Sequence, residues 1–379
     1  MKILIASDSF KGSATTMEVA DSIEKGFAGI YQGVEIVKVP MADGGEGTVE
    51  TLVAGMDSEF AHEEVTGPLG EGVQAKYGII KDEIAIIEMA EASGLVLVKE
   101  EMRNPLLTTT YGTGELILSA LKRGYRKIYV GIGGSATNDG GMGMAKALGY
   151  RFLDRDGNEI PDGGGALGQL QRIDRSKVTP LIEDAKITVM CDVENPLYGT
   201  DGAAYVYGPQ KGANPEMVKL LDENLKHFAD ILRRDMDVDI GDIPGSGAAG
   251  GLGGGLMAFC RAELKPGIEM VLDIQQFEGQ LQGVDLVITG EGRIDGQSAK
   301  GKVPAGVAKL ARKLNKPVVA IAGGIGEGTE GLYSMGIDLI LPIVDRPMGL
   351  GEAMGEAKTL LEKTGERLAR ILMLSEKLK

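Results

Sequence analysis

Four glycine blocks constrain this chain more than any other feature of its sequence. Glycine makes up 58 of the 379 residues, about twice its usual share of roughly 7%. The blocks span 42–48, 133–141, 245–255 and 290–296 and carry carboxylates, hydroxyls or other polar groups. Because glycine has no Cβ, it tolerates positive φ and lets backbone N–H groups approach an anion closely. The pattern predicts several loops that close on an anionic ligand, as in a phosphate-handling enzyme.

Short apolar runs alternate with helical patterns along the chain. Continuous Val, Ile and Leu character indicates strands that are buried on both faces, as in parallel sheets. These runs span 3–6, 35–39, 84–89, 127–132, 186–191, 285–289, 316–322 and 338–344. Helical patterns span 16–30, 114–123, 216–234, 305–314 and 352–378, and Thr15 with Glu18 has capping-box spacing. The alternation predicts an α/β fold with mainly parallel sheets.

The length of the chain favours two domains, because one core seldom grows beyond about 250–300 residues. We expect 1–71 and 275–379 to form one discontinuous α/β domain around a shared sheet. The more irregular region 72–274 then forms a second α/β domain, inserted into the first.

Charge and composition argue against several partners. A formal charge of −15 and the absence of Trp disfavour nucleic-acid binding, which needs clustered cations or stacking aromatics. No apolar run approaches the roughly 18–20 residues that span a bilayer, so no membrane partner is expected. Cys191 and Cys260 are too few and too distant for a metal framework and fit reduced thiols. We therefore expect a cytoplasmic protein.

The block at 245–255 contains Gly245-x-Gly247-x-x-Gly250, formally a dinucleotide fingerprint. The segment before it is acidic and ends in Pro244, whereas the fingerprint should connect a strand directly to a helix. Three interpretations stay open: a phosphate-binding helix N-terminus, a close-packed structural turn, and an NAD site.

A second near miss is Gly296-x-x-x-x-Gly301-Lys302-Val303. A P-loop requires Ser or Thr where Val303 stands, and valine cannot ligate Mg²⁺. This excludes a Walker-type site but leaves Lys302, just before Pro304 at an expected helix start, as a candidate phosphate ligand.

The catalytic base is expected to be a carboxylate, because His62 and His227 are the only histidines and neither lies near a glycine block. Phosphoryl transfer needs a base, positioned cations and Mg²⁺. The lysines in loops are Lys11, Lys211 and Lys302, and the candidate carboxylates are Asp8, Asp43, Asp139, Asp192 and Asp295.

Six ordered motifs spread along the chain resemble those of bacterial glycerate kinases, the family that phosphorylates D-glycerate at its 2-hydroxyl. They lie at 8–12, 42–48, 131–141, 191–197, 208–213 and 289–295. The resemblance implies two α/β domains, one of them Rossmann-like, with the active site in the cleft between them. It also implies MgATP as the phosphoryl donor.

On this basis, we expect loops 133–141 and 245–255 to hold anionic groups, with Lys11 and Lys211 neutralising the phosphoryl group or the substrate carboxylate. Asp192 or Asp295 would act as base, the other serving Mg²⁺. The candidate catalytic residues are Asp192, Asp295 and Lys11. The candidate ligands of substrate and phosphate are Asp8, Ser9, Asp43, Gly44, Gly45, Ser135, Asn138, Asp139, Asn195, Lys211, Gly247, Gly250, Gly251, Glu291, Arg293 and Lys302.

The alternatives are phosphorylation at the 3-hydroxyl, a related small hydroxy acid as substrate, an NAD-dependent oxidoreductase, and a non-catalytic nucleotide-binding regulator. Which carboxylate is the base stays open, as does the choice between monomer and homodimer.

Overall fold

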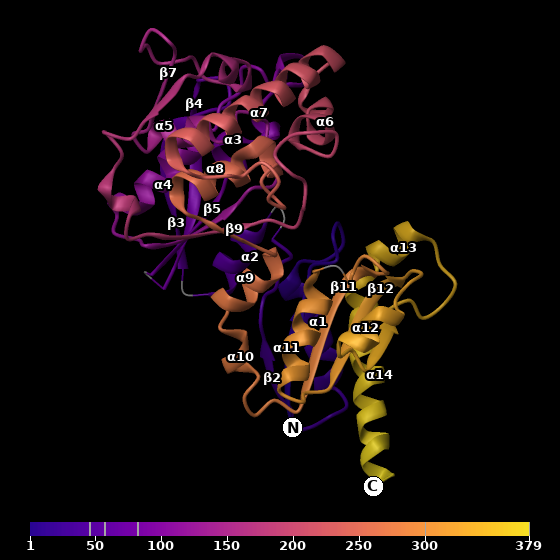
Figure 1. Ribbon diagram of the computed structural model, residues 1–379. Helices are drawn as coiled ribbons and strands as arrows, with labels where there is room; N and C mark the ends of the chain where they lie inside the picture. The colour runs from indigo at the N-terminus through magenta and orange to yellow at the C-terminus, as the bar shows by residue number, and fades with distance from the viewer. Residues whose placement is uncertain (45–46, 57, 82, 300, 379) are drawn as a thin grey trace. The chain divides into compact units, whose positions relative to one another are not determined.

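The structure, a computed structural model, describes residues 1–44, 47–56, 58–81, 83–299 and 301–378. The chain divides into two compact units. The first unit comprises Met1–Gly55 and Pro266–Lys379, and the second comprises Met56–Lys265 (Figure 1).

A five-stranded parallel sheet forms the centre of the first unit. Its order is β13-β12-β11-β1-β2. The strands are β1 (Lys2–Ser7), β2 (Glu35–Lys38), β11 (Leu286–Ile294), β12 (Val318–Ile325) and β13 (Leu339–Pro342). Ile5 lies opposite Ile288 on one side and Lys38 on the other, so β1 is a central strand.

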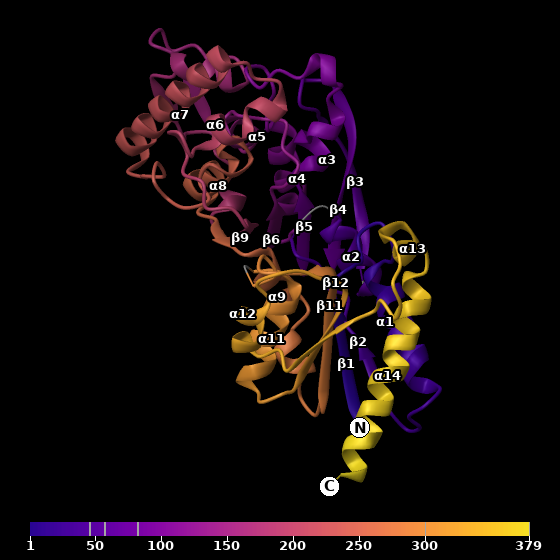
Figure 2. The same cartoon turned by 90° about the vertical axis from the view of Figure 1, so that its right-hand side faces the viewer.

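Helices cover both faces of this sheet. Figure 2 shows α1 (Thr16–Ala28) and α14 (Ala357–Lys377) on one side and α11 (Val303–Lys313) and α12 (Glu330–Met335) on the other. Ile23 and Phe27 of α1 share a buried core with Leu360 and Leu368 of α14. The remaining helices of this unit are α2 (Thr48–Gly55), α9 (Gly267–Ile274), α10 (Phe277–Gln280) and α13 (Leu350–Gly355).

The strand order of the first unit has a switch point between β1 and β11. From β1 the chain continues to β2 on one side of the sheet, and after β11 it continues to β12 and β13 on the other. In open α/β sheets, ligands bind outside the carboxyl ends of the strands at such a point. The fold itself therefore favours a site where β1 and β11 end.

A mixed six-stranded sheet forms the second unit, in the order β10-β9-β6-β5-β4-β3. The pairs β3–β4 and β4–β5 are antiparallel and the others are parallel. These strands are β3 (Ser58–Thr66), β4 (Gly72–Ile80), β5 (Ile84–Glu88), β6 (Lys127–Gly131), β9 (Lys186–Met190) and β10 (Glu263–Lys265), beside a small pair β7 (Arg151–Leu153) and β8 (Arg172–Asp174).

The helices of the second unit bury a large apolar core that includes Phe152, Phe228 and Phe259. The α-helices are α3 (Ala90–Ser93), α4 (Tyr111–Lys122), α5 (Met142–Ala147), α6 (Ala203–Tyr207), α7 (Pro215–Met236) and α8 (Leu252–Cys260). The 3-10 helices are η1 (Leu95–Leu97), η2 (Glu100–Met102), η3 (Gly164–Gln169), η4 (Pro180–Ile182), η5 (Pro209–Lys211) and η6 (Ala248–Gly251).

The α/β fold and each of the eight expected strands are confirmed. Five strands were not expected, namely β3, β4, β7, β8 and β10, and two further details differ. The units divide after Gly55 and Lys265, earlier than the expected boundaries at 71 and 274. The reason is that β3 pairs with β4 along nine residues, which assigns 58–66 to the second unit. Strand β11 continues past Thr289 to Ile294 because it pairs with β12 as far as Ile325. Within the described residues, no helix is both long and apolar enough to cross a membrane.

Candidate active site

A cavity of about 400 Å³ lies at the switch point of the first unit. We call it the β1–β11 pocket. The loop after β1 contributes 8–11 and Ser13, β11 contributes 291–293, β12 contributes Gly323 and Gly324, and further lining comes from Asp43, Lys302 and the region 343–357. Seven sequence-predicted site residues meet here: Asp8, Ser9, Lys11, Asp43, Glu291, Arg293 and Lys302.

Asp8 is the first residue after β1 and is only 7% exposed. Its backbone N–H donates to Gly290 O at 2.9 Å, and Ser9 N donates to its Oδ1 at 2.7 Å. Burial and the negative charges of Asp43 and Glu291 raise the pKa of Asp8 to about 6. The carboxyl group therefore changes its charge close to neutral pH.

Lys11 and Asp43 form a loose ion pair in this pocket. Lys11 Nζ lies 3.5 Å from Asp43 Oδ2, and the lysine side chain is 76% exposed. Exposed pairs of this kind hold their partners weakly, so the Lys11 ammonium can turn toward an anion in the pocket.

Glu291 holds the second lysine of the pocket. Ser298 Oγ donates to Glu291 Oε1, and Lys302 Nζ lies 3.4 Å from Glu291 Oε2. Burial raises the pKa of Glu291, and these two partners oppose the shift. Lys302 is the N-cap residue of α11, with Pro304 in the first turn as expected. The contact between Lys302 and Glu291 indicates that Glu291 positions Lys302.

Asp295 lies just after β11 and does not line the pocket. Gln297 N donates to its Oδ1 at 3.0 Å and Arg293 Nε to its Oδ2 at 3.1 Å. These bonds, that from Gln297 first, lower the pKa of Asp295. A carboxylate already held by two donors is a poor fit for a base or for a Mg²⁺ ligand.

One wall of the pocket is apolar and comes from the region after β13. Ile343, Leu350, Ala353, Met354 and Ala357 line the cavity together with Phe10. Nothing in their spacing marks these residues as part of a site, and sequence reasoning missed them. It also missed Ser298, the partner of Glu291.

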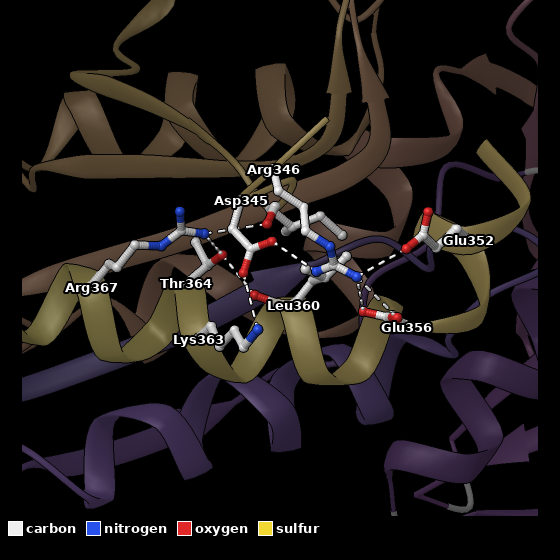
Figure 3. Close-up of polar contacts among 9 residues, drawn as sticks. Asp345, Arg346, Glu352, Glu356, Leu360, Lys363, Thr364 and Arg367 are labelled. Carbon is white, nitrogen blue, oxygen red and sulfur yellow. Dashed lines mark hydrogen bonds and ion pairs between the residues drawn. The ribbon is translucent and has the colours of Figure 1, made fainter. Parts of the chain in front are cut away.

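A charged network holds this wall (Figure 3). Arg346 donates to Asp345, Glu352 and Glu356 at 3.0–3.1 Å, and Lys363 bonds the other oxygen of Asp345. Arg346 thereby connects the segment after β13 to α13 and to the start of α14.

The second unit contains another group of predicted residues, in the glycine loop 133–141 after β6. Asp139 in this loop is fully buried and accepts bonds from Thr110 N, Thr110 Oγ1, Gly141 N and Gly143 N at 2.9–3.1 Å. Burial raises the pKa of Asp139, and the donors oppose the shift. Since its oxygens are taken by four donors, the side chain fixes the loop and the start of α5.

Lys211 is bound to the same loop. Its Nζ donates to Thr137 O at 2.6 Å and to Ser135 Oγ at 3.2 Å, and the residue is 1% exposed. Burial lowers the pKa of Lys211 to about 7. Asn138 is fully buried, and neither polar atom of its side chain has a hydrogen-bond partner among the described residues. Contact of these side chains with an anion stays a prediction.

The glycines at 245–255 are packed against neighbouring backbone. A Cβ on Gly247 would lie 2.1 Å from Pro196 O, and one on Gly250 would lie 2.0 Å from Thr137 O. Between α7 and η6, a segment described throughout, there is no strand. The context of a dinucleotide fingerprint is therefore missing, and close packing accounts for these glycines.

The other predicted residues that the structure describes are not among those that line the β1–β11 pocket. Asn195 donates to Asp201 O and accepts from Tyr207 Oη, so it holds a loop. Gly251 packs against Gly140, and Gly44 against Gly267. Asp192 is exposed after β9, and Gly45 lies outside the described residues.

Comparisons with known proteins give the same family along nearly the whole chain. The model of the family described as the glycerate kinase family matches residues 3–373. A glycerate kinase of Halalkalibacterium halodurans is 52% identical over 97% of both chains. The glycerate 2-kinase of Escherichia coli K12 is 50% identical over 99% of this chain and 98% of its own. A crystal structure of a protein assigned as glycerate kinase 2 from Salmonella typhimurium LT2 superposes with a TM-score of 0.90 at 47% identity, covering 100% of this chain and 99% of the other.

Proposed function

Because the chain belongs to the glycerate kinase family and is therefore a kinase, we propose that it transfers the γ-phosphoryl group of MgATP to D-glycerate. The acceptor is the 2-hydroxyl, so the products are 2-phospho-D-glycerate and ADP. Support for the regiochemistry comes from the glycerate 2-kinase relative, which is 50% identical.

The composition of the β1–β11 pocket is the observation that carries the proposal. Two lysines, one arginine and three carboxylates line a single cavity at the switch point. Phosphoryl transfer depends on cations around the transferred group and on a carboxylate near the attacking hydroxyl. The pocket supplies both kinds of group within one unit of the chain.

Both lysines of the pocket have a role in this proposal. Lys11 turns from Asp43 toward the transferred phosphoryl group, and Lys302 stays beside Glu291 and binds a second anionic group. The positive charges of both lysines stabilise the negative charge that the transition state spreads over the phosphoryl oxygens. Ser9 offers a hydroxyl donor to the carboxylate of glycerate.

Mg²⁺ enters as part of the nucleotide substrate. Among the described residues, no group of three or more His, Cys, Asp or Glu side chains is arranged so that it could hold a metal ion, and Asp295 is already held by Arg293 and Gln297. Mg²⁺ often keeps its waters and is held through substrate phosphates with one or two carboxylates. Asp192 is the other carboxylate predicted to bind Mg²⁺, and this role stays a prediction.

The glycine loop 133–141 of the second unit has a supporting role in this proposal. Lys211 and Asp139 fix its backbone, which leaves N–H groups of the loop for an anion. The alternative of an NAD-dependent oxidoreductase is not supported, because the glycines at 245–255 are packed against neighbouring backbone.

The test measures ADP release by the purified protein in MgATP, with and without D-glycerate, using a coupled optical assay. We expect ADP formation that saturates with D-glycerate and is at least tenfold slower with L-glycerate or lactate. ADP release that ignores glycerate, or binding of ATP without turnover, would contradict the proposal. NADH titration followed by fluorescence is the matched control and should show no binding.

A further inference from the structure

We propose that Asp8 is the general base of this reaction and accepts the proton of the attacking hydroxyl. The inference rests on the function proposed above. It assigns to Asp8 a role that sequence reasoning leaves open between Asp192 and Asp295.

The position of Asp8 suits a base at the reacting centre. It follows β1 directly at the switch point and lines the β1–β11 pocket. Its backbone is fixed by the bond to Gly290 O, and Ser9 N orients its Oδ1. Its Oδ2 has no hydrogen-bond or ion-pair partner among the described residues. One carboxylate oxygen is thus held in place while the other is left for a substrate hydroxyl.

The two other carboxylates that line the pocket are less suited. Both oxygens of Glu291 are taken, one by Ser298 and one by Lys302. Asp43 is less buried than Asp8, with its side chain 26% exposed, and it is the neighbour of the Lys11 ammonium. Among the described lining residues, Asp8 alone combines burial with an oxygen that has no partner.

The charges around Asp8 suit proton transfer near neutral pH. Asp43 faces it from the segment after β2, Glu291 from β11, and Lys11 from its own loop. Lys302 and Arg293 also line the cavity, whereas β12, α13 and α14 contribute only uncharged residues. Burial, Asp43 and Glu291 outweigh Lys11, so the pKa of Asp8 rises to about 6. A base whose pKa lies near the working pH is the most effective.

The chemical step balances as follows. The O–H bond at C2 of glycerate breaks and its proton passes to Asp8 Oδ2. The hydroxyl oxygen forms a bond to the γ-phosphorus, and the bond from that phosphorus to the bridging β–γ oxygen breaks, its electron pair leaving on ADP. Asp8 then loses the proton to solvent.

The first test replaces the base with its isosteric amide in Asp8→Asn. We expect kcat to fall by about 10²–10⁴-fold, with MgATP affinity by calorimetry changed less than threefold. In the wild type, kcat/KM for D-glycerate should fall tenfold per pH unit below about 6, and the residual activity of Asp8→Asn should lack this acidic limb. Turnover of Asp8→Asn within threefold of the wild type would overturn the proposal.

A second variant decides the matter even where Asp8→Asn fails to fold. Asp43→Asn removes a negative charge that raises the pKa of Asp8, so the acidic limb should move to lower pH. Glu366→Gln on α14, outside the pocket lining, is the control and should leave the limb in place. A limb that stays unmoved in Asp43→Asn overturns the role of Asp8 alone, while a wild type without glycerate-dependent ADP release overturns the proposed function as well.

Discussion

Lys211 lies in a loop whose sequence suggests a phosphate ligand, but the burial of its side chain indicates a structural role. In sequence it is a lysine between glycines, but in the structure its ammonium is enclosed and bonded to Thr137 O and Ser135 Oγ. It therefore holds the glycine loop in shape. Whether it also contacts a phosphoryl group stays a prediction.

The lowered pKa of Lys211 predicts a pH dependence of stability. Above about pH 7 the folded protein has lost this proton, whereas the unfolded lysine keeps it up to about pH 10.4. Since the unfolded state binds more protons than the folded state in this pH window, the free energy of unfolding increases with pH. Urea unfolding at pH 7 and pH 9.5 should show this gain in the wild type but not in Lys211→Met.

Lys219→Met, at an exposed position on α7, is the matched control and should keep the gain. Curves for Lys211→Met that run parallel to the wild type at both pH values would contradict the prediction.

Asp8 and Asp295 illustrate what could be predicted for the site. An apolar run followed by Asp8 and Lys11 marks the carboxyl end of a strand, and in the structure this loop lines a cavity. Which aspartate keeps a free oxygen depends on bonds to Ser9, Gln297 and Arg293. Those bonds follow from the folded loops and leave no mark in residue spacing.

Strands and helices with a continuous or strictly periodic apolar pattern could be predicted, and others could not. Helix α1 is confirmed with its capping box, in which Thr15 and Glu18 bond each other reciprocally. Strand β3 was missed because His62, Glu63 and Glu64 interrupt its apolar pattern. The predicted end of β11 was wrong because Gly290 suggests a loop. In the structure this glycine lies within the strand, where a Cβ would come within 2.2 Å of Ile321 O.

Close packing of η6 against the glycine loop predicts a large effect for Gly250→Ala. The new Cβ would lie 2.0 Å from Thr137 O, and the residue has φ +70°. We expect a loss of roughly 3 kcal/mol in the free energy of unfolding from overpacking and strain together. Gly157→Ala has a similar φ of +85° with open space around it, and should lose only about 1 kcal/mol.

Urea unfolding of both variants separates the two contributions. Equal losses in Gly250→Ala and Gly157→Ala would show that strain alone acts and would contradict the packing argument.

The network around Arg346 predicts an effect on binding more than on stability. Arg346→Met leaves Asp345, Glu352 and Glu356 without their shared cation, so α13 and its apolar wall should become less well placed. We expect KM for one of the two substrates to rise roughly fivefold, equivalent to about 1 kcal/mol, with kcat changed less than twofold. The free energy of unfolding should change by less than about 1 kcal/mol because the network is exposed.

Arg370→Met removes another exposed pair of α14, with Glu366, and serves as the matched control. Kinetic constants that are the same in Arg346→Met and Arg370→Met would contradict a role for the network in shaping the pocket.

For the molecule as a whole, the sequence predicts the class of fold but not the order of its strands. Buried parallel strands look alike in sequence, and no local signal tells that β1 lies between β2 and β11. That order depends on crossovers over long stretches of chain, including the whole segment 56–265 between the two parts of the first unit. The switch point, and with it the position of the pocket, emerges only from this long-range arrangement.

The proposed chemistry makes a claim about one bond, from phosphorus to the oxygen at C2 of glycerate. Proton-coupled phosphorus NMR of a reaction containing the protein, MgATP and D-glycerate reads that bond directly. Phosphate on C2 is coupled to a single proton and should give a doublet, together with the resonances of ADP. A triplet, from phosphate coupled to the two protons of C3, would contradict the proposed regiochemistry, and the absence of any new phosphate ester would contradict the proposed function.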